Sequence, residues 1–326
     1  MTAGPGPGRP AGPSQSGPSQ SGPSQSGPSQ SGPPQSGPPQ SGPPQSGAPQ
    51  SGAPPAGAPP AGAQRGQPLQ AGRLRAAVLT GQSLWSDIAV VAQTGSTNED
   101  LLAAARAGAP EGSVLVAEQQ IRGRGRLGRS WVSQPSAALT FSVLLRPAVV
   151  PRSARGWLPL LAGVAVASAV RAGTGLEVTL KWPNDVLAGG AKLAGILAEQ
   201  AGDAVVLGIG INVSASQDEL PSAAATSLLL QGAAADRELL LAGLLGQLEH
   251  WYRRWTGPPA GDAIGSGLRA EYLRLSATVG QQVRVELPGG GVLAGQARDV
   301  DATGRLVVLT ADGDQAVSAG DVVHVR

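Results

Sequence analysis

The sequence predicts a mixed α/β domain followed by a small all-β module. From residue 87 onwards, short apolar runs with strand character alternate with longer Ala- and Leu-rich segments of helical spacing. From residue 279 the helical segments stop, and short strands separated by Gly and Asp turns follow one another, as in a small β-barrel. The stretch 1–72 has neither periodicity, so we expect no packed structure there.

The elements of the mixed domain are expected in the following order. Helices are predicted at 73–79, 99–106, 157–172, 236–255 and 262–275, and strands at 87–93, 113–118, 139–145, 178–182, 193–199 and 205–213. Ser96 or Thr97 is a suitable N-cap for the second helix, because acidic residues follow in its first turn. Gly108 and Gly175 suit the ends of the second and third helices.

The C-terminal module is expected to contain four strands, at 281–287, 291–300, 304–310 and 322–326. The predicted domain organisation is therefore a tail at 1–72, the mixed α/β domain at 73–276 and the β module at 277–326. In the tail a glycine recurs every fifth residue from Gly12 to Gly62, whereas collagen requires one at every third. With no apolar anchors, the tail is expected to be disordered.

Composition excludes several classes of protein. Outside the tail the acidic and basic residues are equal in number, which argues against a general nucleic-acid-binding surface. The chain has no cysteine, so disulfides, thiolate metal sites and a cysteine nucleophile are excluded. No apolar run predicts a membrane span, and no signal peptide is recognisable, so a cytoplasmic protein is expected.

Lysine and asparagine are scarce. Arginine supplies 22 of the 24 basic residues, because lysine occurs only at positions 181 and 192. Asparagine occurs only at 98, 184 and 212. A compact ammonium cannot be replaced by a guanidinium, so the remaining lysines are candidates for functional positions.

The first motif is Gly-Arg-Gly-Arg-Leu-Gly-Arg at 123–129, followed by Ser130 and Trp131. Its glycines permit close backbone approach to a ligand, and its arginines suit carboxylates and phosphates. The motif lacks the ending of a P-loop. A solvated or RNA-binding loop is the alternative interpretation.

The second motif is Lys181-Trp182-Pro183-Asn184-Asp185, followed by a strand that carries Lys192 and Gly195. Pro183 interrupts strand pairing, so Asn184 and Asp185 are expected at a strand end, where ligand contacts are common. A surface lysine beside an Asn-Asp turn is the alternative.

The third motif is Gly-Ile-Gly-Ile-Asn at 208–212. In a strand, Gly208, Gly210 and Asn212 share one face. Because glycines weaken a strand, they suggest a flat ligand lying against bare backbone, with Asn212 as its polar contact. A bulge or tight packing is the alternative.

Together these segments resemble the biotin–protein ligases. The resemblance runs from about Trp85 to the C-terminus and rests on an ordered set of short motifs: STN, AEQQ, GRGRLGR, KWPND, KLAGIL and GIGIN. It implies a mixed sheet with helices like the core of class II aminoacyl-tRNA synthetases, plus a C-terminal SH3-like barrel. It also implies activation of biotin by ATP and Mg²⁺, followed by transfer to a lysine of a carboxylase's biotin carrier domain.

The resemblance also implies roles for individual residues. Arg126 and Lys192 would be catalytic. The expected biotin-binding residues are Ser96, Thr97, Asn98, Gln120, Arg124, Gly125, Arg126, Lys192 and Gly195. The expected adenylate-binding residues are Arg126, Arg129, Trp131, Asn184, Asp185 and Asn212. The metal ligands and the oligomeric state are left open.

Some members of the family carry an N-terminal DNA-binding domain and repress transcription. Here the repeat tail precedes the domain and cannot form packed helices, so we expect a ligase without a repressor role. A lipoate ligase is the enzymatic alternative. A nucleic-acid binder that uses the 123–129 loop is the non-enzymatic one, and it leaves KWPND and GIGIN unexplained.

Overall fold

The computed structural model describes residues 66–325, so the tail predicted for 1–72 lies almost entirely outside the described residues. Within that range the first helix begins at Ala71, slightly before the expected start of the catalytic domain. Its Leu74 is buried, and it packs beside the first strand and the long fourth helix.

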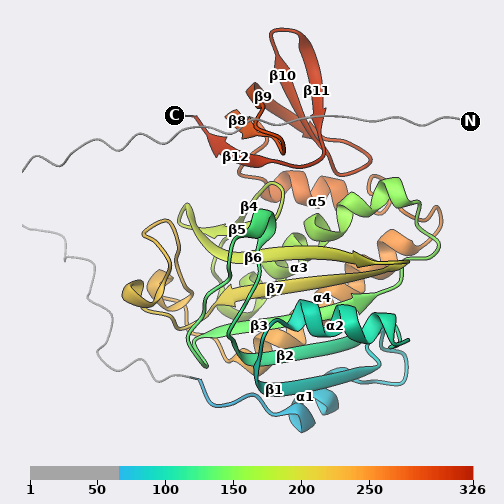
Figure 1. Cartoon of the computed structure of the whole chain (residues 1–326), viewed down its shortest axis with the longest axis vertical. Coiled ribbons are helices and arrows are strands. Elements are labelled where there is room, and N and C mark those ends of the chain that lie inside the picture. The colour runs from blue at the N-terminus through green and yellow to red at the C-terminus, as the bar shows by residue number, and fades with distance from the viewer. Residues whose placement is uncertain (1–65, 326) are drawn as a thin grey trace, which may run out of the picture. The chain divides into compact units, whose positions relative to one another are not determined.

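A seven-stranded mixed sheet forms the centre of the catalytic domain (Figure 1). Its strands are β1 (Asp87–Thr94), β2 (Ser113–Gln120), β3 (Ala138–Leu145), β4 (Thr179–Lys181), β5 (Asp185–Ala188), β6 (Ala191–Ala201) and β7 (Ala204–Asn212). Their order across the sheet is β1-β2-β3-β7-β6-β5-β4. Only β1 and β2 run parallel; the other neighbours are antiparallel.

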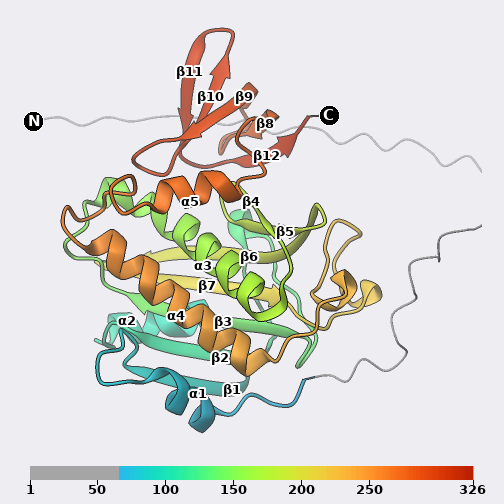
Figure 2. The ribbon, with the colours of Figure 1, turned by 180° about the vertical axis from the view of Figure 1, so that it is seen from behind.

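Helices cover both faces of this sheet (Figure 2). They are α1 (Ala71–Val78), α2 (Thr97–Arg106), α3 (Trp157–Thr174), α4 (Arg237–Thr256) and α5 (Leu268–Leu275). Short 3-10 turns lie at Arg126–Gly128, Arg152–Gly156, Gln217–Glu219 and Leu229–Gln231. Since α2 packs on one face and α3 with α4 on the other, every residue of β3 is buried, which explains its nearly continuous apolar run.

The segment 152–174 is long and apolar enough to cross a membrane by length and composition. In the fold, however, 67% of an apolar 18-residue stretch of this segment is buried. The reason is that α3 lies between the sheet and α4. A helix that is apolar on all sides is expected at such a core position.

Helix ends follow the expected capping chemistry, with one correction. The Ser96 hydroxyl accepts from the backbone N–H of Glu99, and the Asp236 carboxylate accepts from the first turn of α4. The last helix, expected from 262, begins only at Leu268. Gly267 stands before it with φ +79°, a left-handed conformation that separates the preceding turns from the helix.

The C-terminal module is a five-stranded antiparallel sheet, not the four strands expected. Its strands are β8 (Gln282–Glu286), β9 (Val292–Val300), β10 (Leu306–Thr310), β11 (Gly313–Val317) and β12 (Asp321–His324), in the order β11-β10-β9-β8-β12. The strand at 313–317 was not predicted because its sequence does not alternate between apolar and polar residues. Most of its side chains are exposed. The indole N–H groups of Trp157 and Trp182 donate to backbone carbonyls of the 301–304 turn, joining this sheet to the catalytic domain.

Candidate active site

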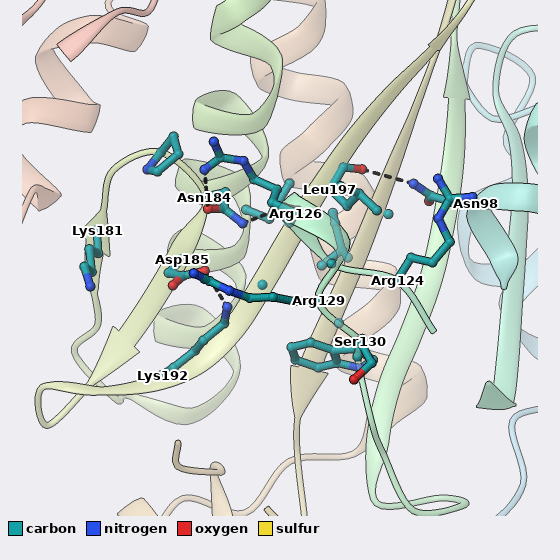
Figure 3. Close-up of a pocket in the computed structure, with 18 of the residues that line it drawn as sticks. Asn98, Arg124, Arg126, Arg129, Ser130, Lys181, Asn184, Asp185, Lys192 and Leu197 are labelled. Carbon is teal, nitrogen blue, oxygen red and sulfur yellow. Dashed lines mark hydrogen bonds and ion pairs between the residues drawn. The ribbon is translucent and has the colours of Figure 1, made fainter. Parts of the chain in front are cut away.

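A cavity of about 400 Å³ opens beside the central strands (Figure 3). Residues of the C-terminal sheet also line it. Segments far apart in the sequence meet there: the start of α2, the end of β2, the Gly/Arg segment 123–131, the β4–β5 hairpin, β6 and β7. Strands β8 and β12 contribute Glu286, Asp321, Val322 and Val323. The cavity is therefore completed by both modules.

One end of the cavity is a buried polar network. Thr97 donates from its backbone N–H and its hydroxyl to Gln120 Oε1, at 2.8 and 3.0 Å. Ser142, fully buried on β3, places its hydroxyl 2.7 Å from Thr97 Oγ1 and 2.6 Å from Asn98 Oδ1. Because these partners fix the side chains, this end offers a preformed set of donors and acceptors to a polar ligand.

The Gly/Arg segment folds back on itself over the cavity. The backbone N–H of Gly125 donates to Arg129 O, and that of Trp131 donates to Gly123 O. At the tip, Leu127 has φ 55°, a strained conformation for a leucine, and its side chain is exposed. The backbone thus carries successive arginines to different parts of the cavity.

Each of these arginines has a different partner. Arg124 pairs with Glu99 and Glu199, and Arg129 pairs with Asp321 of β12. Arg126 donates to Asn184 Oδ1 at 3.1 Å, beside Gly320 O at 3.5 Å. Burial lowers the pKa of the Arg126 guanidinium, while Asp185 opposes that shift and Arg129 adds to it.

The Lys-Trp-Pro-Asn-Asp motif forms a hairpin. Asp185 lies at a strand end, as predicted: it is the first residue of β5 and pairs with Lys181 on β4. Lys192 on β6 pairs with Asp185 at 2.6 Å. Burial lowers the pKa of Lys181. Asp185 opposes this shift, whereas the positive charges of Lys192 and Arg129 add to it.

The charge of this end of the cavity follows from these neighbours. Arg126, Arg129, Lys181 and Lys192 approach one another around Asp185 (Figure 3). Asp321, which pairs with Arg129, and Glu286 also line the cavity, but the cationic side chains still outnumber the carboxylates. An anionic ligand would relieve that imbalance.

The glycines of β7 are covered by the protein's own side chains. A Cβ at Gly210 would lie 2.3 Å from the Trp131 ring, and one at Gly208 would lie 2.3 Å from Asn98 Oδ1. The sequence suggests a flat ligand against bare backbone; in this structure the flat group at Gly210 is the Trp131 indole. Glycine is required because any side chain would displace Trp131 or Asn98.

The predicted site residues come together with one exception. The cavity is lined by Ser96, Thr97, Asn98, Gln120, Arg124, Gly125, Arg126, Arg129, Trp131, Asn184, Asp185, Lys192 and Gly195. Asn212 lies outside this lining, and its contact with an adenylate stays a prediction. Its amide donates to Thr226 O at 2.9 Å, so Asn212 fastens the end of β7 to the following segment.

Several residues were missed by sequence reasoning. Lys181, which its rarity marked as a candidate but to which no role was assigned, lines the cavity. Asp321 and Glu286 come from the C-terminal sheet, and nothing in their local sequence indicates a distant cavity. Glu199 stands outside the lining but contacts two of its members, Asn98 and Arg124.

Fold and cavity together define an enzyme-like class of protein. A preformed polar end and a strongly cationic end share one cavity, and an arginine-bearing segment folds over both. Such a site suits a small molecule with a polar head and an acidic group, together with a second anion.

Comparison with known proteins identifies the class more closely. Residues 90–216 match the biotin/lipoate A/B protein ligase family, and residues 278–325 match the biotin protein ligase C-terminal domain. A biotin–[acetyl-CoA-carboxylase] ligase of Mycobacterium tuberculosis is 47% identical over 263 residues, covering 79% of this chain and 97% of the relative. The bifunctional ligase/repressor BirA of Bacillus subtilis is 31% identical, covering 76% of each chain.

Solved structures agree with these relatives. The biotin protein ligase of Aquifex aeolicus in complex with biotin and ATP superimposes with a TM-score of 0.63 at 29% identity, covering 74% of this chain and all of that one. The chain belongs to the biotin protein ligase family. The predicted mixed fold with an added C-terminal β domain is confirmed.

Proposed function

We propose that the protein activates biotin with ATP and transfers it to a lysine of the biotin carrier domain of a biotin-dependent carboxylase. In the first step an oxygen of the biotin carboxylate attacks the α-phosphorus of ATP, and pyrophosphate leaves. In the second, the neutral amine of the acceptor lysine attacks the carboxyl carbon of the biotinyl-adenylate. AMP leaves, the amine loses a proton, and an amide forms.

The observation that carries this proposal is the union of four cationic side chains and a preformed polar end in one cavity. Two anions must meet in the first step, and their repulsion is reduced only where fixed cations lie between them. Arg126 would hold the carboxylate and the α-phosphate, and Lys192 would contact the activated carboxyl oxygen. Both side chains face the same part of the cavity (Figure 3).

The remaining residues would divide between the two substrates. Ser96, Thr97, Asn98 and Gln120 would bind the polar ring of biotin, with Arg124, Gly125 and Gly195 closing around it. Arg129, Trp131, Asn184 and Asp185 would surround the adenylate. Arg124 and Arg129 already pair with carboxylates of the same molecule, which favours this use over nucleic-acid binding.

Mg²⁺ would enter as part of the ATP substrate. Among residues 66–325, no group of three or more acidic or histidine side chains is arranged to hold a metal ion. Of the carboxylates that line the cavity, Asp185 already pairs with Lys192 and Asp321 with Arg129. The phosphates and water would therefore supply most ligands of the ion, as is usual for Mg²⁺.

The wider organisation is proposed on the same basis. Residues 73–276 would form the catalytic domain and 277–326 the SH3-like domain. We propose a cytoplasmic enzyme. We also propose that it has no DNA-binding role, since acidic and basic residues outside the tail are equal in number.

The direct test mixes purified protein, ATP, Mg²⁺, biotin and an apo carrier domain, and measures the mass of the carrier. We expect the mass of one biotinyl group to be added, only in the complete mixture. A carrier whose acceptor lysine is replaced by arginine should stay unmodified. No modification of the intact carrier by a folded protein would contradict the proposed function.

A further inference from the structure

Glu199 joins two parts of the site that are distant in sequence. It lies on β6 with its side chain 19% exposed. One carboxylate oxygen accepts from Asn98 Nδ2 at 2.8 Å, and the other pairs with Arg124. Asn98 belongs to the polar end of the cavity, whereas Arg124 belongs to the segment that folds over it.

The contact with Asn98 fixes the orientation of its amide. Asn98 Nδ2 faces Glu199 and Leu197 O, and Asn98 Oδ1 faces the Ser142 hydroxyl at 2.6 Å. A carboxylate can only accept, so it requires the NH₂ side of the amide to point toward β6. Ser142 also touches Thr97, which extends the same network across the polar end.

The contact with Arg124 determines the position of the covering segment. Arg124 has two carboxylate partners, Glu99 and Glu199. The side chain of Glu99 is 43% exposed, so solvent weakens that pair. Glu199 is less exposed and is the partner that Arg124 and Asn98 share.

We propose that Glu199 is a positioning residue that couples occupation of the polar end to closure by Arg124. If a ligand bonded to the Thr97–Asn98 network holds Asn98 in place, it also holds the carboxylate, which in turn orders Arg124 above the ligand. By linkage, an ordered Arg124 must strengthen ligand binding by the same factor. This inference rests on the proposed function, because it takes biotin as that ligand.

The test compares Glu199→Gln with its matched control Glu99→Gln. Both remove one negative charge beside Arg124, but only E199Q alters the residue shared with Asn98. We expect E199Q to weaken biotin binding by about tenfold or more, as for loss of charge-assisted bonds. It should also hasten loss of biotinyl-adenylate and leave the KM for ATP unchanged, whereas E99Q should change biotin affinity much less.

A double-mutant cycle separates coupling from simple loss of a contact. Arg124→Ala should weaken biotin binding in the wild-type and E99Q backgrounds, yet add little in the E199Q background. Additive effects of R124A and E199Q, or equal biotin affinity of E199Q and wild type, would overturn the inference. If E199Q does not fold, E199D gives the same test, because the shorter carboxylate cannot span both partners.

The controls also separate this inference from the proposed function. Wild-type protein that shows no biotin binding by calorimetry would count against the proposed function itself. Wild-type protein that binds biotin, with variants that fail the cycle, would count only against Glu199.

Discussion

At the scale of single residues, the rare side chains mark the site. Of the lysines and asparagines in the chain, Lys181, Lys192, Asn98 and Asn184 line the cavity. Lys192 has a geometric reason to resist exchange. It places its ammonium 2.6 Å from the Asp185 carboxylate, and the planar guanidinium of a longer side chain cannot present the same point charge there.

Lys192→Arg should therefore reduce the rate of adenylate formation by about 10²-fold or more, the range seen when a donor to developing charge is lost. Charge is retained, so the defect would arise from the shape of the group. Single-turnover formation of biotinyl-adenylate measures it. Arg75→Lys, an exchange at an exposed ion pair, is the control and should be neutral. A fully active K192R enzyme would remove the proposed role of the ammonium.

Residue patterns located the site better than they explained it. Ser96, Gln120 and Arg126 could be assigned to one site through the family resemblance of their motifs, and the structure brings them to one cavity. For Asn212, strand periodicity gave the face of the residue but not the bond of its amide to Thr226 O. Glu199 was missed because its partners lie 75 and 101 residues away.

At the scale of elements, β7 and the Gly/Arg segment depend on each other. Gly210 leaves space for the Trp131 indole, and a Cβ at Gly195 on the neighbouring strand would lie only 3.2 Å from the same ring. The packing of Trp131 thus sets how the covering segment returns to the sheet. The glycines of β7 are explained by such contacts and not by backbone conformation, because their φ values are not positive.

Gly210→Ala should displace Trp131 and weaken ATP binding, at a stability cost of about 1–3 kcal/mol typical of overpacking. Tryptophan fluorescence and the KM for ATP report the two effects. The control is Gly243→Ala on α4, where an added Cβ meets nothing within 4 Å and stability should rise by about 0.5–1 kcal/mol. Unchanged fluorescence and KM in G210A would show that Trp131 is not held by this contact.

The ends of helices and strands could be predicted only where the sequence contains a recognisable capping residue. The start of α2 followed from Ser96, but β5 was hidden within a short turn-rich stretch after Pro183. Likewise Gly267 delays the start of α5, although the apolar spacing continues before it. Tertiary pairing, which is not encoded locally, decides such short elements.

At the scale of the whole molecule, the C-terminal sheet is part of the active site. Asp321 pairs with Arg129, and Gly320 O lies beside Arg126. On the same strand as Asp321, His324 Nε2 lies 3.3 Å from Thr278 Oγ1, which accepts from the backbone N–H of Trp182. The junction between modules therefore includes a titratable group next to the KWPND hairpin.

This junction should make stability depend on pH. Burial, followed by the nearby Lys181, lowers the pKa of His324, so the fold favours neutral imidazole. Just below pH 6.5 the unfolded chain then binds more protons than the folded one, and stability falls as pH falls toward the folded pKa. His324→Gln should flatten this slope, as measured by urea unfolding between about pH 7 and about pH 5.

His250→Gln, at an exposed position on α4, controls for the loss of a histidine elsewhere. If the free energy of unfolding changes with pH equally in H324Q and wild type, protonation of His324 does not affect the stability of the junction. A slope that is flattened in H324Q alone would support the assignment.

The central claim is that one cationic cavity joins the carboxylate of biotin to the α-phosphate of ATP. Pyrophosphate–ATP exchange measures this step without any acceptor protein. The account predicts exchange that requires biotin, is not supported by lipoate, and is lost in Arg126→Ala while the variant stays folded. Exchange that lipoate supports equally well, or that persists undiminished in R126A, would contradict it.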